Sequence, residues 1–529
     1  MAARSDVTIR TGRPAFDGLA PRVRSFLEHD RLDLVIDGQR VRGYRPPDAR
    51  GIWIRDHSDM MRGFRYFEPD VTSAVQHFAN TQAESGRIFD YFTTFPEKPP
   101  SERENWTKYV RVPVEADVEY RFVKGAYLAW QASGDDEWIE RLLPRLEKAL
   151  AYIQRHPWYW DDQHGLAKRA YTIDTWDFAY TAGRHPWLQF QIDGDTFWGL
   201  MHGDNSGYYE AFRLLAALHR RVGDGSRADW WDIRAEALRE NLNRYCWNGR
   251  FYTHFVKLRP VVIDGVDEST QLSLSNPMAI NRGAADHAQA VAILGEYQRR
   301  RAASPAFAEW FSIDPPFPDG IFGDPRLVAG AYCNGGIMPL VGGELARAAF
   351  EHGCEAYGVD ILERYWQMIA ARGETYLWYF PDGTPSTVET STSPDALPTD
   401  GWGSSAMLWA LVEGLAGVVD RGCAFDAVTI SPRWLAAGVE EAEVSVGYAA
   451  SQRGVGYLFR ALPDRLVIEA DAEATDAQFH VLLPAGATPR WVRCGARELP
   501  FRVASVEQSA YADFAMHVDG SARVEIGLR

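Results

Sequence analysis

The chain has 529 residues, enough for one large folded core with an appended domain. Its hydrophobic content is 46%, as in ordinary globular proteins, and 56 basic against 72 acidic residues give a net charge of −16. This acidic balance disfavours nucleic acid and anionic membranes as partners, and it favours a neutral or weakly polar small molecule as the substrate.

Residues 1–50 are expected to form an N-terminal extension, with a β-hairpin at "RLDLVIDGQRVRGY". The N-terminus "MAARSDVTIRTGRPAFDG" lacks the apolar region of a signal peptide, and no stretch is apolar enough to span a bilayer. We therefore expect a cytoplasmic protein with no membrane partner. The five cysteines show no paired spacing, which predicts free, mostly buried thiols.

Residues 51–422 are dominated by helix-length amphipathic stretches such as "RLEKALAYIQRH" and "GYYEAFRLLAALHRRVGD". Roughly ten to twelve such stretches occur, many paired through short loops, and no fixed repeat indicates a solenoid. The pattern favours a mainly α fold, an (α/α)6 toroid of six helical hairpins. Long loops rich in aromatic residues, near 90–110, 155–205, 302–330 and 374–402, are expected to form a cleft at one rim.

Residues 423–529 change to an alternating pattern, seen in "AEVSVGYAA", "VGYLFRAL" and "RLVIEADA". Short strands at regular spacing with Gly, Pro and Asp turns predict a C-terminal antiparallel β-sandwich domain.

Two carboxylates stand three positions apart among aromatic side chains in "YTIDTWDFAY", namely Asp174 and Asp177. One interpretation is a helix N-terminus, where an aspartate caps free N–H groups. The other is a sugar pocket, where rings pack on the sugar and a carboxyl donates a proton to the glycosidic oxygen. The 19 Trp, 23 Tyr and 26 Phe residues fit such a pocket, although a large helical core uses them too.

Further carboxylates lie at the expected starts of helices, where capping is again the alternative. "GIWIRDHSDMMRG" contains Arg55, Asp56, His57 and Asp59, "VPVEADVEY" contains Glu115, Asp117 and Glu119, and "HGDNSGYYEA" contains Asp204. The first and third segments could equally bind a substrate, whereas capping is the stronger interpretation of the second, because the helix dipole favours acids there in any case.

Glu389 stands in the polar loop "PSTVETSTSPDALPTDGWGSSAM", just after the aromatic run "YLWYF". A carboxylate in a polar loop stays ionised and can activate water, whereas the aromatic neighbours of Asp177 raise a carboxyl pKa. Together they would supply an acid and a base. No HExxH, paired CxxC, EF-hand, phosphate-binding or GxSxG motif is present, so we expect no metal and no cofactor.

The order of these motifs resembles that of the (α/α)6-barrel glycosidases related to trehalase, processing α-glucosidase and mannosylglycerate hydrolase (glycoside hydrolase family 63), and alkaline invertase. The resemblance runs over about residues 51–420 and rests on order and spacing. It implies that Asp56 is a sugar-binding aspartate, Asp177 the general acid and Glu389 the general base. "PVEADVEY" also resembles an invertase segment, which would make Asp117 the acid instead.

We therefore expect an inverting, exo-acting α-glycosidase acting on a small soluble glycoside. Alternatives in the same barrel class are an α-L-rhamnosidase, an inverting phosphorylase and a sugar epimerase, and the alternative outside enzymes is a carbohydrate-binding protein. The sugar, the aglycone and the oligomeric state stay open. The residues expected to bind the substrate are Trp53, Arg55, Asp56, His57, Asp174, Trp176, His202, Asp204, Trp378 and Trp402.

Overall fold

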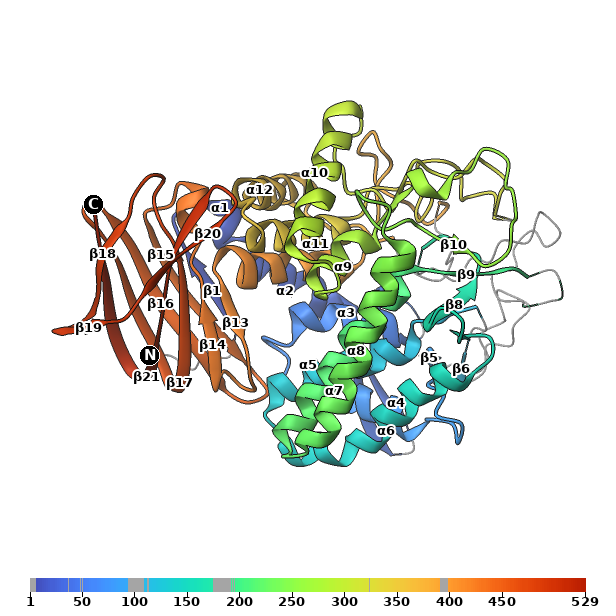
Figure 1. Cartoon of the computed structure of the whole chain (residues 1–529), viewed down its shortest axis with the longest axis horizontal. Coiled ribbons are helices and arrows are strands. Elements are labelled where there is room, and N and C mark those ends of the chain that lie inside the picture. The colour runs from blue at the N-terminus through green and yellow to red at the C-terminus, as the bar shows by residue number, and fades with distance from the viewer. Residues whose placement is uncertain are drawn as a thin grey trace.

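The computed structural model describes residues 6–36, 38–47, 49, 51–93, 109–111, 114–174, 192, 194, 196–322, 324–390 and 398–529. Helices fill the middle of the molecule, a large sheet lies at one end, and loops with short strands lie at the other (Figure 1). Both labelled chain ends lie in the region of the large sheet.

The α-helices are α1 (Pro14–Asp17), α2 (Leu19–Asp30), α3 (Ile54–Phe64), α4 (Ser73–Asn80), α5 (Val118–Ser133), α6 (Asp136–Arg155), α7 (His202–Arg221), α8 (Gly225–Cys246), α9 (Ser275–Asn281), α10 (His287–Ala303), α11 (Pro339–Glu351), α12 (Glu355–Arg372) and α13 (Gly401–Trp409). Shorter helical segments are η1 (Glu268–Thr270), η2 (Ala410–Leu415), which is a π-helix, and η3 (Trp434–Ala437).

The strands are β1 (Val7–Arg10), β2 (Arg31–Ile36), β3 (Gln39–Tyr44), β4 (Ile52–Trp53), β5 (Tyr91–Phe92), β6 (Tyr109–Val110), β7 (Trp160–Asp161), β8 (Leu166–Ala170), β9 (Trp198–Leu200), β10 (Val256–Lys257), β11 (Leu272–Ser273), β12 (Ile313–Asp314), β13 (Val418–Asp420), β14 (Ala427–Ile430), β15 (Glu441–Tyr448), β16 (Arg453–Leu462), β17 (Arg465–Leu482), β18 (Pro489–Cys494), β19 (Arg497–Leu499), β20 (Arg502–Val506) and β21 (Ser509–Leu528).

Local sequence signals fix the ends of the long helices. Asp135 begins α6 by accepting a hydrogen bond from the backbone N–H of Trp138, at 2.8 Å. Asp224 caps α8 in the same way. Helix α5 ends at Gly134 in the left-handed region (φ 74°), which a residue without Cβ adopts without strain. The amphipathic stretches quoted above form α6 and α7, as predicted.

Six helices, called the inner helices below, contact one another in a closed circuit, and five others, the outer helices, pack against them. Helix α3 packs on α5, α5 on α7, α7 on α9, α9 on α11, α11 on α13, and α13 on α3 again. Helices α6, α8, α10, α12 and α2 pack in turn on α5, α7, α9, α11 and α13. Helices α5, α7, α9, α11 and α13 therefore each have a partner among the outer helices.

Close helix packing explains the glycine-rich "GGIMPLVGGE", a segment that lacks the pattern of a phosphate-binding loop. A Cβ on Gly343 of α11 would lie 2.5 Å from the backbone carbonyl carbon of Ala406 on α13. Only a residue without a side chain allows α11 and α13 to approach so closely.

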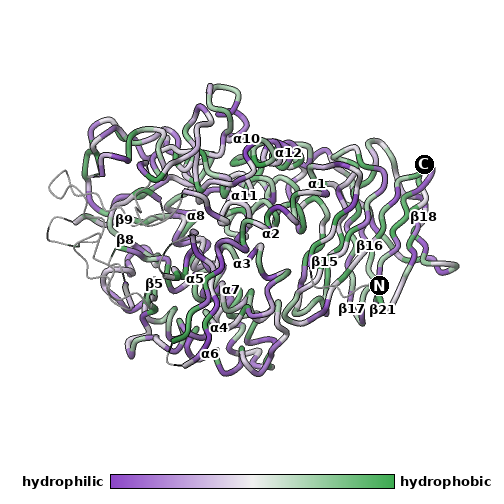
Figure 2. The backbone as a smooth tube through the Cα atoms, turned by 180° about the vertical axis from the view of Figure 1, so that it is seen from behind, coloured by the Kyte–Doolittle hydropathy of each residue, from purple (hydrophilic) through white to green (hydrophobic). Residues whose placement is uncertain are grey.

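The large sheet has ten strands, in the order β1-β15-β16-β17-β21-β18-β19, with β13, β14 and β20 joined beside this path. Hydrophobic and hydrophilic residues alternate along its strands (Figure 2), which is the period of two that the sequence showed. The pairing is antiparallel apart from β14, which pairs with β17 in parallel. The domain boundary at residue 423 stays a prediction, since the sheet also includes β1 and β13 from outside the range 423–529.

Small sheets stand at the opposite end from the large one. Strands β4, β5 and β6 form one of them, and β10, β9, β8 and β7 form another. Strand β4 leads directly into α3, and β9 leads into α7, so both sheets lie at the N-terminal ends of inner helices (Figure 1).

All five cysteines are free, and Cys246, Cys333 and Cys423 are buried, which confirms the predicted thiols. Across the part of the chain that the structure describes, every helix is too short or too polar to pass through a lipid bilayer.

Candidate active site

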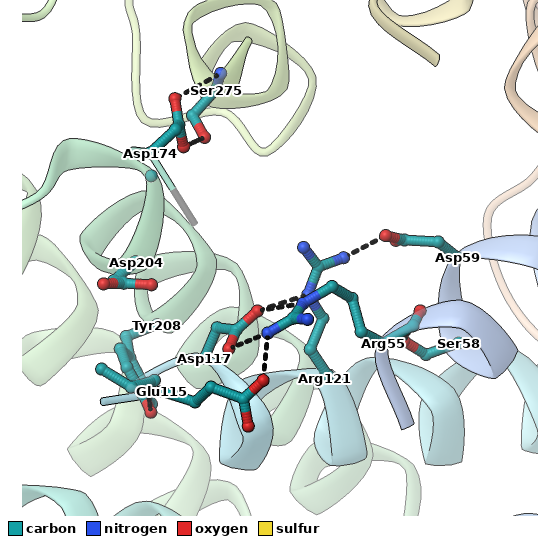
Figure 3. A network of polar contacts seen from close by, with 12 residues as sticks. Arg55, Ser58, Asp59, Glu115, Asp117, Arg121, Asp174, Asp204, Tyr208 and Ser275 are labelled. Carbon is teal, nitrogen blue, oxygen red and sulfur yellow. Dashed lines mark hydrogen bonds and ion pairs between the residues drawn. The ribbon is translucent and has the colours of Figure 1, made fainter. Parts of the chain in front are cut away.

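Charged side chains gather where the inner helices begin (Figure 3). Asp117 immediately precedes α5, Asp204 lies in the first turn of α7, and Ser275 begins α9. The N-terminal end of a helix carries partial positive charge, so carboxylates are stabilised there. Where several such ends meet, one site can hold many acidic groups, because the helix ends offset part of the repulsion between the carboxylates.

The Arg55 side chain binds two buried carboxylates. Its Nε and Nη2 donate to the two oxygens of Asp117, at 2.8 and 2.9 Å, and Nη2 also donates to Glu115 Oε1, at 3.0 Å. Burial alone would raise the pKa of Asp117, but the charge and hydrogen bonds of Arg55 outweigh burial and hold that pKa well below its usual range. Asp117 is therefore ionised and oriented by a two-point contact.

Asp59 lies on the next turn of α3 after Arg55 and accepts from two partners. Trp402 Nε1 donates to its Oδ2 at 2.8 Å, and Arg121 of α5 forms an ion pair with the same oxygen. The positive charge of Arg121 overcomes the effect of burial and lowers the pKa of Asp59. These contacts join α3, α5 and α13 by buried charges, and Figure 3 shows Arg121 between Asp117 and Asp59.

The Asp56 side chain is partly exposed, whereas those of Asp59 and Asp117 are buried. Among the described residues, its carboxylate takes part in no hydrogen bond to another side chain. Burial of the surrounding site raises its pKa to about 6, against the opposing charge of Arg55. A partly exposed acid that titrates near neutrality and is free to take a partner is suited to bind a hydroxyl group.

Asp204 and Asp174 occupy the other side of the site. Arg169 Nη1 lies 3.3 Å from Asp204 Oδ1, and burial raises the pKa of Asp204 to about 6 in spite of that contact. Asp174 has a left-handed backbone (φ 45°), and its carboxylate accepts from the N–H and hydroxyl of Ser275. The backbone N–H of Asp174 donates to His254 Nε2 at 2.8 Å, so the residue is held at three points.

The two histidines expected to bind substrate are buried. His57 Nδ1 accepts from the backbone N–H of Tyr44 at 3.2 Å, and burial lowers its pKa to about 3. His202 Nε2 lies 2.9 Å from Ser273 Oγ, and burial lowers its pKa to about 4. Both rings are therefore neutral near pH 7, and both have protein partners in the described part of the chain.

The remaining predicted residues lie in different surroundings. Asp177 and Trp176 fall outside the described residues. Glu389 is exposed in a turn, where a hydrogen bond from Thr387 lowers its pKa. Trp378 and Trp402 are 2% and 4% exposed, so neither presents an open ring face to solvent. Trp402 instead contributes its N–H to the site.

A second pair of acids lies behind the site, at the start of α13. Asp400 caps this helix through the N–H of Trp402, at 2.8 Å, and Asp30 at the end of α2 lies close to it. Burial raises the pKa of Asp400 well above its usual range, and the charge of Asp56 adds to this effect. Burial and the charge of Asp400 do the same to Asp30.

Several residues of the site escaped the sequence interpretation, namely Arg121, Arg169, Ser275 and Asp400. A signal was present for Arg121, which follows Asp117 by four positions and so lies one helical turn further along the same face. Asp59 and Glu115, which the sequence shows as acids at helix starts, do lie in the site. No cluster of three or more potential metal-ligating side chains occurs among the described residues.

No protein-family model and no curated protein matches the chain. Solved structures do share its fold. They include a GH78-family rhamnosidase of Bacillus sp. GL1 (TM-score 0.61, 16% identity, 91% of this chain and 43% of that one) and a Streptomyces avermitilis α-L-rhamnosidase complexed with L-rhamnose (0.61, 14%, 99% and 42%). A GH63 mannosylglycerate hydrolase from Thermus thermophilus, in complex with Tris, matches at 0.51 and 14% identity, over 74% of this chain and 99% of that one.

The chain thus has the fold of glycoside hydrolases in which a helical domain accompanies a large antiparallel sheet. It spans 43% and 42% of the length of these two rhamnosidase chains. At 14–16% sequence identity, this similarity shows the fold alone.

Proposed function

We propose that the protein is an inverting, exo-acting α-glycosidase whose helices form an (α/α)6 toroid. The closed circuit of contacts from α3 round to α13 supports the toroid. The observation that carries the function is the gathering of Arg55, Asp59 and Asp117 at the N-terminal ends of α3 and α5 (Figure 3), with Asp56 next to Arg55 in the first turn of α3. Fixed carboxylates beside arginines match the donors and acceptors of a sugar ring, as a neutral ligand requires.

Sugar recognition is assigned to the floor of this site. Asp56 has a carboxylate available to accept from hydroxyl groups, and the buried Asp59–Arg121 ion pair holds the wall beside it in place. Arg55 acts indirectly, because its hydrogen bonds are directed to Asp117 and Glu115. It positions the loop that carries these acids.

The proton-transfer roles are proposed for Asp177 and Glu389. Asp174 anchors the chain at the site three residues before Asp177, through its contacts with Ser275. Glu389 is ionised and exposed to water, which are the properties of a general base. An inverting pair needs its carboxyls about 6.5–9.5 Å apart, so that water fits between them. Asp117 is not proposed as the acid, because its pKa is held low by Arg55 and it has no proton to donate.

The test is hydrolysis of a panel of α-glucosides, α-mannosides and α-L-rhamnosides by the purified protein, with the anomer released first followed by NMR. Asp177→Asn and Glu389→Gln should each lower kcat by roughly 100-fold or more, since general acid–base groups contribute about 10²–10⁴-fold. Asp162→Asn and Asp382→Asn are matched controls, because both replace exposed acids and Asp382 lies in the same loop as Glu389. Full activity in both test variants would remove the proposed pair.

A second candidate, an α-L-rhamnosidase, is favoured by one observation. The rhamnosidase structures align with 91–99% of this chain, whereas the mannosylglycerate hydrolase aligns with 74%. Release of rhamnose alone from the panel would select this candidate. A requirement for inorganic phosphate would indicate a phosphorylase, and sugar binding without turnover would indicate a carbohydrate-binding protein.

A further inference from the structure

Two small sheets carry aromatic side chains next to the site. Trp53 ends β4, one residue before α3 and two before Arg55, and its ring centroid lies 4.3 Å from that of Tyr91 on β5. Trp198 begins β9, six residues before Asp204. Trp53 and Trp198 both pack against one small buried cluster that includes Tyr91. The rings therefore lie where the chain enters the site from two sides.

Trp158 extends this aromatic surface outward. It lies between α6 and β7, its side chain is 42% exposed, and its ring centroid is 6.5 Å from that of Trp198, with 31° between the planes. Trp198 is itself partly exposed, and Lys168 Nζ lies 5.9 Å from the centre of its ring. Trp158 and Trp198 are thus neighbouring indoles that both keep part of their surface open to solvent.

Trp230 on α8 is also exposed, but its ring, unlike that of Trp158 in the described part of the chain, is covered by cations. It is 40% exposed, but Arg227 and Arg234 lie over its ring at 4.3 and 4.5 Å, so cations already use its π system. Among the described residues, no cation lies over Trp158. Its described ring neighbours are His156, at 5.5 Å and edge-on, and Trp198.

An exposed indole loses the benefit of burial, about 1.5–3 kcal/mol for a large apolar side chain. An indole combines a wide apolar face with a polar N–H, so an exposed ring that continues an aromatic surface next to a site can bind a ligand there. Trp158 neighbours Trp198 of β9, and β9 leads into α7, which carries Asp204, so this ring is joined to the site through Trp198.

We propose that Trp198 and Trp158 form the subsite for the leaving group of the glycoside, and that this group contains a ring with an apolar face. The inference rests on the proposed hydrolase function. A second sugar ring and an aryl group share this chemistry, since either can lie flat against indole. The sugar that is cleaved would lie deeper, beside Asp56, and the ring that departs would lie on the tryptophans.

The experiment compares methyl, phenyl and disaccharide α-glycosides of the sugar that the wild-type protein hydrolyses. Trp158→Ala and Trp198→Leu should lower kcat/KM for ring-bearing leaving groups by roughly 10-fold, the scale of one aromatic contact. The methyl glycoside should change less than about 2-fold, because it makes no such contact. Trp230→Ala is the matched control, since it removes a similarly exposed tryptophan whose ring is already covered by Arg227 and Arg234.

The outcomes separate the possible occupants. Loss confined to the phenyl glycoside identifies an aryl group, and loss confined to the disaccharide identifies a sugar. Equal loss for all three substrates, or no loss for any, overturns the subsite. If the wild-type protein hydrolyses nothing, the proposed function fails by itself, and titration of phenyl and methyl α-glucoside against tryptophan fluorescence then tests the subsite. A phenyl-specific response that disappears in Trp158→Ala and persists in Trp230→Ala supports it, and any other pattern overturns it.

Discussion

Replacing Arg55 by methionine should destabilise the protein to an extent that depends on pH. The change removes both hydrogen bonds that Arg55 donates to Asp117, and leaves Arg121 Nε at 3.6 Å as the nearest cation. Asp117 is fully buried, so in the variant it is expected to take up a proton rather than stay charged. The unfolded chain has no such constraint.

The magnitude follows from proton binding. An aspartate in an unfolded chain has a pKa of about 3.9, and each pH unit corresponds to about 1.36 kcal/mol, so protonating Asp117 at pH 7 costs about 4 kcal/mol. This agrees with the loss of about 3–5 kcal/mol that follows when one partner of a buried ion pair is removed.

The direction in which the free energy of unfolding changes with pH follows from the same pKa values. In the wild type the pKa of Asp117 lies below its usual value, so its contribution to stability is complete above about pH 4 and is lost only in stronger acid. In the variant the folded-state pKa lies above the unfolded value, so stability falls as pH rises. The difference in free energy of unfolding should therefore shrink by about 2.7 kcal/mol between pH 7 and pH 5.

Urea unfolding followed by tryptophan fluorescence at pH 5, 6 and 7 measures this difference. A double variant, Arg55→Met with Asp117→Asn, is the control, because residue 117 can then no longer take up a proton. Its difference from wild type should lack the part of the pH dependence that comes from Asp117 and keep only the part that comes from Glu115, the other buried partner of Arg55. A single-variant loss that does not change with pH, or one below about 1 kcal/mol, would refute the reasoning.

Three further changes test other parts of the structure by the same unfolding assay. Gly343→Ala should destabilise by about 1–3 kcal/mol, because its Cβ would overlap α13, whereas Gly225→Ala, with no atom within 4 Å of the new Cβ, should have no harmful effect. Trp402→Phe should cost more than Trp231→Phe, since the first loses a bond to a buried carboxylate and the second a bond to a partly exposed one; equal losses would contradict this. Asp400→Asn should stabilise the protein at pH 8 and not at pH 4. The asparagine keeps the helix cap, and it removes a buried acid whose raised pKa makes the free energy of unfolding fall as pH rises. A gain in stability that is independent of pH would contradict this.

The elements were predictable where a segment carries its own pattern. Helices α6, α7 and α8 follow from apolar residues on one face, and β16 and β17 follow from alternation. Strand β1 could not be placed in the large sheet, because four residues give little pattern and the partner strand lies 433 positions away.

The site was predictable only where a segment carries its own pattern. The sequence predicted the acidic segments at helix starts, but it did not predict the partners of these acids. Trp402 and Asp59 are 343 positions apart, and their hydrogen bond exists only because α13 closes on α3. The ion pair between Arg55 and Asp117 likewise changes the chemistry of both residues, and the sequence of neither segment predicts it. The roles of Asp177 and Glu389 stay predictions.

The pairing of β1 with β15 has a consequence for biosynthesis. Arg10 and Glu443 face each other in this ladder, so the ribosome must add more than 400 residues before β1 meets its partner. At about 5–20 residues per second this takes roughly 20–90 s, during which Val7 and Ile9 have no sheet to cover them. Removing β1 would in turn leave the edge of β15 open to strands of other molecules, which is a common route to aggregation.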